Sequence, residues 1–104
     1  MRIVVDEISG KPQFRLEDAD EFGSLHIEPA DPKYRIWADR LSALGRPSGA
    51  QQVFVDPDTI RGLAGEKALD PSWSTRFEAM IEFADCRGWI SPAGEIRVHI
   101  ALRV

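Results

Sequence analysis

The sequence predicts an α+β fold, with short N-terminal strands, then three helices, then a C-terminal β-hairpin. Two observations predict it. Asp-Pro pairs occur at residues 31–32, 56–57 and 70–71, and each places a capping carboxylate directly before a proline suited to the first position of a helix. The last nine residues place a large apolar side chain at every second position, as a strand with one buried face does.

A chain of 104 residues can build one hydrophobic core, so we expect a single domain over residues 1–104. Within it we distinguish a strand and turn segment, 1–30, from a helical core and hairpin, 31–104. The single cysteine, Cys86, cannot form an internal disulfide, and no apolar run has the length of a signal peptide core or a membrane span. These features favour a cytoplasmic protein that does not enter a membrane.

The N-terminal segment is predicted to begin with a hairpin. Residues 3–8 are mostly β-branched, Ser9-Gly10-Lys11-Pro12 has the composition of a turn, and apolar residues alternate with Arg15 beyond it. The acidic run 17–21 then interrupts the pattern, and one more short strand is expected at 25–27.

Three helices are expected after the three Asp-Pro pairs. The first spans residues 32–44, and Gly45 stops it; its apolar face consists of Tyr34, Trp37, Ala38, Leu41 and Leu44. A short strand, 52–55, leads into the second helix, which begins after Asp56 and ends at Gly65. The third runs from Pro71 to a stop at Gly88, with Trp73, Phe77, Met80, Ile81 and Ala84 on one face.

The predicted C-terminal hairpin turns at Ser91-Pro92-Ala93-Gly94. Its second strand turns Ile96, Val98, Ile100, Leu102 and Val104 to the core and carries Arg97, His99 and Arg103 on its polar side.

From residue 32 onward, this order of elements resembles a winged helix-turn-helix domain. The resemblance rests on Thr59-Ile60-Arg61-Gly62-Leu63-Ala64 in the second helix, on residues 77–90 with their Gly88-Trp89-Ile90 exit, and on Gly94-Glu95-Ile96-Arg97 after the turn. It implies a third helix that enters the major groove of DNA. Here that helix exposes Glu78, Glu82 and Asp85, and the chain has a net charge of −4, so nucleic acid is disfavoured as a partner.

Candidate functional residues fall into two groups. Arg97, His99 and Arg103 share one side of a strand and could bind an anion or another ligand, although a solvated or salt-bridged strand face is the favoured explanation. Ile36 and Phe83 lie off the apolar stripes of their predicted helices and are candidates for a partner surface. No residues have metal-ligand spacing, no cofactor motif is present, and Cys86 lacks a recognisable histidine partner for catalysis.

These observations favour a small non-catalytic module that interacts with protein or regulates it, and that self-associates as a homodimer through a helix face or the C-terminal strand. Two alternatives stay open. One is a small enzyme or ligand-binding domain that uses His99 and Arg97, and the other is a winged-helix DNA-binding protein.

Overall fold

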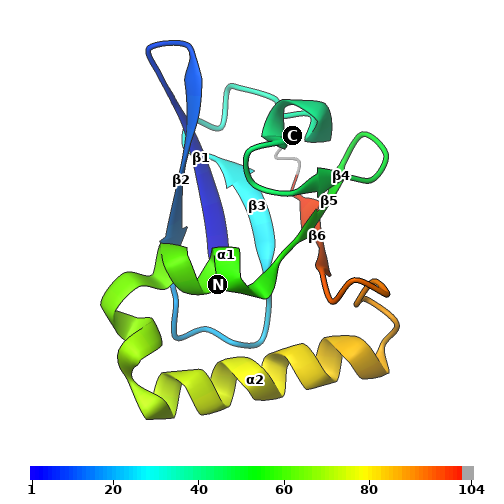
Figure 1. Cartoon of the computed structure of the whole chain (residues 1–104). Coiled ribbons are helices and arrows are strands. Elements are labelled where there is room, and N and C mark those ends of the chain that lie inside the picture. Colours follow the sequence, from blue (N-terminus) through cyan, green and yellow to red (C-terminus); the bar gives the residue numbers. More distant parts are fainter. Residues whose placement is uncertain (102–104) are drawn as a thin grey trace.

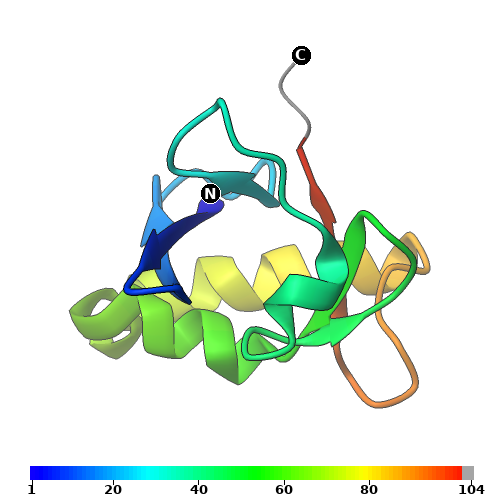
Figure 2. The ribbon, with the colours of Figure 1, turned by 90° about the horizontal axis from the view of Figure 1, so that it is seen from above.

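The computed structural model describes residues 1–101 and contains one mixed six-stranded sheet with strand order β2-β1-β3-β6-β5-β4 (Figure 1). The strands are β1 (Arg2–Ile8), β2 (Lys11–Glu17), β3 (His26–Pro29), β4 (Arg46–Pro47), β5 (Gln52–Val55) and β6 (Ile96–Ile100). The α-helices are α1 (Pro57–Ala64) and α2 (Pro71–Cys86), and the short 3₁₀ helices are η1 (Ala38–Leu41) and η2 (Gly65–Leu69). The sheet is curved, and α1 lies on one side of it (Figure 2).

The predicted N-terminal hairpin is confirmed. Strands β1 and β2 pair antiparallel from Arg2 opposite Glu17 to Ile8 opposite Lys11. The connecting residues have positive φ angles, 54° at Ser9 and 77° at Gly10, as a two-residue type I′ turn requires. This turn matches the twist of the strands and fixes the register of the hairpin.

The predicted C-terminal hairpin is wrong, because β6 lies in the interior of the sheet. It pairs parallel with β3 on one side and antiparallel with β5 on the other. The turn at 91–94 does form, and the N–H of Gly94 donates to the carbonyl of Ser91 at 2.9 Å. Before that turn, however, the described chain forms no strand. It contributes an isolated bridge between Ile90 and Ile96, flanked by hydrogen bonds from the N–H of Ser91 to the carbonyl of Glu95 and from the N–H of Arg97 to the carbonyl of Trp89, each 2.8 Å long. From Ile96 to Ile100 this strand has neighbours on both sides, so its described part does not offer the free edge through which self-association was predicted.

The predicted helix over residues 32–44 is also absent. The Asp31 carboxylate accepts a hydrogen bond from the N–H of Lys33 at 2.9 Å, as an N-cap would, but the chain then turns and becomes extended, with φ −109° and ψ 145° at Trp37. Only η1 within this range is helical. With two α-helices and an interior β6, residues 1–101 do not form the predicted three helices and C-terminal hairpin, nor the winged-helix-like layout that went with them.

The two remaining Asp-Pro pairs do begin helices. The Asp56 carboxylate accepts from the N–H of Asp58 at 2.8 Å, and the Asp70 carboxylate accepts from the N–H of Ser72 at 2.9 Å. In α2, Trp73 and Phe77 are buried as predicted, with their rings stacked 4.9 Å apart. Both helices bury their apolar faces against the sheet.

One continuous core forms on the helix-bearing side of the sheet. It contains Ile3, Ile27, Val53, Val98 and Ile100 from the strands, Ile60 and Phe77 from the helices, and Leu41 and Leu44 from the region of η1. The opposite face of the sheet is mostly polar. Leu41 and Leu44 thus reach the core without the predicted helix.

Candidate functional site

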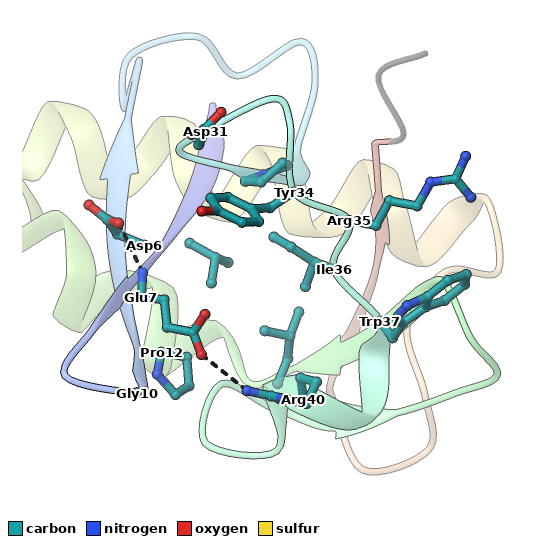
Figure 3. A pocket seen from close by; sticks show the side chains of 13 residues that line it. Asp6, Glu7, Gly10, Pro12, Asp31, Tyr34, Arg35, Ile36, Trp37 and Arg40 are labelled. Atoms are coloured by element: carbon teal, nitrogen blue, oxygen red, sulfur yellow. Dashed lines mark hydrogen bonds and ion pairs between the residues drawn. The ribbon is translucent and has the colours of Figure 1, made fainter.

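A cavity of about 580 Å³ opens between the β1–β2 hairpin and the segment of residues 30–41, which we call the groove (Figure 3). Its floor is apolar and consists of Val5, Pro12, Pro29, Ile36 and Leu41. Its rim carries Asp6, Glu7, Asp31, Tyr34 and Arg40. This volume lies within the range of sites that bind small molecules or single side chains of a partner.

The groove exists because β1 is longer than its neighbour β3. Pairing between them ends at Val5 opposite Pro29, and the N–H of Ala30 donates to the carbonyl of Val5 at 2.8 Å. The chain then leaves the sheet. Residues 6–8 of β1 continue past this point, paired with β2 on one side and with no described strand on the other.

The backbone of this free edge faces the groove at Glu7. In a strand, successive residues direct their backbone groups to alternate sides, and Val5 directs its carbonyl toward β3. Glu7, two residues on, therefore directs its backbone to the same side. Its N–H is held by the Asp6 carboxylate at 2.9 Å, a contact that a ligand would have to displace.

An ion pair spans the groove. Glu7 Oε1 on β1 lies 3.1 Å from Arg40 Nη2 on η1, and both side chains are more than half exposed. Figure 3 also shows the ring of Tyr34 beside the apolar floor and the side chain of Arg35 directed away from it. Asp6, Glu7 and Asp31 thus line the groove with Arg40 as the one arginine directed toward it.

Tyr34 is the most exposed aromatic residue of the groove, with 69% of its surface accessible. Trp37 follows with 43%. An extended chain between a proline and a 3₁₀ helix leaves both rings without a covering element. Large exposed aromatic side chains beside an apolar floor are typical of recognition surfaces.

The two residues predicted for a partner surface lie in different places. Ile36 lines the groove and packs partly against the core. Phe83 is 53% exposed on α2, outside the groove, where its ring meets Trp89 edge-on at 6.1 Å and the Arg87 guanidinium lies 5.0 Å from it. The structure therefore brings only Ile36 to the groove.

The predicted ligand residues Arg97 and His99 are exposed on the polar face of β6, outside the groove, and Arg103 lies outside the described residues. His99 stacks on His26 of the neighbouring β3, with ring centroids 6.0 Å apart. This pair adjoins a charged cluster. His26 Nε2 lies 3.3 Å from a carboxylate oxygen of Glu28, which is 3% exposed.

Arg2 completes the charged cluster. Its guanidinium binds the Glu28 carboxylate and donates to Asp18 Oδ2 at 2.9 Å. Hydrogen bonds to these two carboxylates raise the pKa of Arg2 above its usual value. The guanidinium is committed to the cluster, which tethers β1 to β3 and to the loop after β2.

Sequence reasoning missed most of the groove. The helical spacing of Tyr34 and Trp37 predicts a buried helix face, but that helix does not form, and Glu7 and Arg40 carry no recognisable signal in the sequence. These residues become neighbours only when the hairpin and the 30–41 segment are placed beside each other. The one signal available was Ile36, an apolar residue that did not fit its predicted stripe.

Residues 1–101 contain neither a candidate metal site nor a candidate membrane-spanning helix. No group of three or more His, Cys, Asp or Glu side chains is arranged to hold a metal ion. No helix in this range combines the length and the apolar character needed to cross a membrane. No protein-family model matches the chain, and comparisons with curated proteins and with solved structures found no match either.

Proposed function

We propose that this protein is a non-catalytic binding module that holds an extended segment of a partner protein in the groove. One observation carries the proposal. Strand β1 runs three residues beyond its pairing with β3, and this free edge borders a cavity with an apolar floor. An exposed strand edge next to a side-chain pocket is the arrangement by which domains add a strand from a partner.

An extended segment suits both parts of the groove. Its backbone would pair with β1 at Glu7, and because side chains of a strand alternate, one of them would point to the floor formed by Val5, Ile36 and Leu41. Main-chain hydrogen bonds supply affinity in such complexes, and the pocket supplies specificity. A single apolar side chain is the expected anchor.

The rim favours a basic residue beside that anchor. Glu7 and Asp31 are both at the rim, and the Glu7 carboxylate can exchange Arg40 for a cation of the segment because the existing pair is exposed. The ring of Tyr34 offers a face for the same cation. We therefore expect segments with an apolar residue and a neighbouring Lys or Arg.

The test is a selection from a displayed library of random peptides, followed by affinity measurements with purified variants. We expect enrichment of peptides with that pattern, and at least tenfold weaker binding by Tyr34→Ala, whose exposed ring can be removed with little effect on folding. Glu66→Gln, a carboxylate-to-amide change at an exposed position on η2 outside the groove, is the control for the Glu7→Gln variant described below and should bind normally.

Two results would contradict the proposal. The selection could enrich no peptide, or the enriched peptides could bind Tyr34→Ala and the wild-type protein equally well. A second variant, Glu7→Gln, separates the role of charge, because it should weaken binding more at low salt than at high salt.

A further inference from the structure

Strand β2 forms one edge of the sheet and pairs with β1 alone among the described strands (Figure 1). Successive residues of β2 direct their backbone N–H and C=O groups alternately toward β1 and away from it. Ile8 and Lys11 flank a two-residue turn, so the backbone groups of these two residues point toward each other. The backbone groups of Lys11, Gln13 and Arg15 therefore point toward β1. Those of Pro12, Phe14 and Leu16 point outward.

The side chains along β2 separate by face. Pro12, Phe14 and Leu16 are half-buried, and the last two pack against the core side of the sheet. Lys11, Gln13, Arg15 and Glu17 project from the opposite face, and all but Glu17 are exposed. The edge thus offers a partly uncovered apolar row and a row of mixed charge.

Among the registers that keep most of β2 paired, the charges on this strand favour one. An antiparallel pair of β2 strands centred on Phe14 places Lys11 opposite Glu17 of the second copy at both ends of the contact, and Gln13 opposite Arg15. Centring the pair on Gln13 would place Lys11 opposite Arg15, and centring it on Arg15 would oppose two arginines. If the two-fold axis passed between two residues, core-facing side chains of one copy would lie opposite polar side chains of the other, on the same face of the sheet.

We propose that two copies of this chain associate through β2, in antiparallel pairing about Phe14. Two hydrogen bonds join the Phe14 residues, and two more run from the Leu16 N–H groups to the Pro12 carbonyls. Pro12 has no N–H to donate, so the ladder has four bonds and the contact is weak and reversible. The Phe14 rings meet across the two-fold axis and extend the apolar row.

Sedimentation velocity over a range of protein concentrations, at low salt, tests this pairing. The wild-type chain should associate as its concentration rises. Lys11→Glu should weaken the dimer by about tenfold, because two opposite-charge pairs become like-charge pairs. The double variant Lys11→Glu/Glu17→Lys should restore association, because both pairs are reformed with reversed signs.

Lys33→Glu, which changes the net charge equally at an exposed position outside β2, is the control and should associate normally. Circular dichroism checks that each variant is folded. Glu17 lies 3.6 Å from Arg2 and 3.7 Å from Arg15, so the double variant needs this check most. Backbone hydrogen exchange provides a second readout that needs no mutation.

In that exchange experiment the amides of Phe14 and Leu16 should become protected as concentration rises, while those of Gln13 and Arg15 stay protected throughout by β1. A wild-type monomer at every concentration would overturn the proposal. So would a dimer that Lys11→Glu leaves unchanged, or one in which the Phe14 and Leu16 amides exchange freely. The backbone edge of β1 that borders the groove faces away from β2, and the two contacts share only Pro12, so association tested at Lys11, Glu17, Phe14 and Leu16 can succeed or fail separately from peptide binding.

Discussion

Replacing Gly45 by alanine should destabilise the protein strongly, because a side chain there has no room. A Cβ atom at this position would lie 2.3 Å from the carbonyl oxygen of Phe54 and 2.9 Å from Val53 Cγ1. Both atoms belong to β5, which is paired on both sides, and Val53 is fully buried. β5 cannot move away without disturbing β4 or β6.

The expected cost follows from that geometry. Forcing an extra carbon into a packed interior costs about 1–3 kcal/mol, and a clash with backbone rather than with a flexible side chain belongs at the upper end. A loss of about 3 kcal/mol is a large fraction of the 5–15 kcal/mol that holds a typical domain folded. Urea denaturation followed by tryptophan fluorescence measures it.

Gly62→Ala is the matched control and should have the opposite sign. Gly62 lies within α1, and no atom comes within 4 Å of the Cβ position. Alanine favours a helix over glycine by about 1 kcal/mol, so this variant should be more stable than the wild-type chain. Equal stability of Gly45→Ala and the wild-type chain would refute the close approach of the chain at Gly45 to β5.

Three further predictions concern stability. Asp56→Ala and Asp70→Ala each remove a helix cap, and each should lower the free energy of unfolding by about 1 kcal/mol in the same urea assay. An unchanged free energy would show that the capping hydrogen bond does not stabilise the helix. Trp73→Phe should lower the free energy of unfolding by about 1–3 kcal/mol, because the indole N–H donates to the carbonyl of Ala19 at 2.8 Å and the ring is buried. An unchanged free energy would show that this hydrogen bond does not stabilise the fold. Arg40→Ala should change stability by less than about 0.5 kcal/mol, since its ion pair is exposed, and a larger loss would show that the 30–41 segment depends on it.

Local sequence signals predicted the local structure well. The turn within Ser9-Gly10-Lys11-Pro12 and the caps at Asp56 and Asp70 involve only neighbouring residues, and each forms as expected, the turn as type I′ at Ser9-Gly10. Asp31-Pro32 carries the same local signal, and its carboxylate makes the same kind of hydrogen bond, yet no helix follows. The capping pair specifies a first turn, and tertiary contacts decide whether a helix continues from it.

Long-range pairing could not be predicted from these patterns. The alternation in β6 correctly indicated a strand with one buried face, but it says nothing about which strands lie beside it. Its partners are β3, about seventy residues earlier in the chain, and β5. The groove depends on the same non-local arrangement, because its walls come from β1 and from a segment that reaches it only after β3 ends.

The central claim is that the free edge of β1 and the 30–41 segment together form a binding site. Amide chemical-shift mapping by NMR, with a peptide from the library selection, tests it most directly. We predict that the largest shifts fall on residues 6–8 and 34–40, with protection of the Glu7 amide from hydrogen exchange. Largest shifts on the polar face of β6, at Arg97 and His99, or on α2 near Phe83, would contradict it.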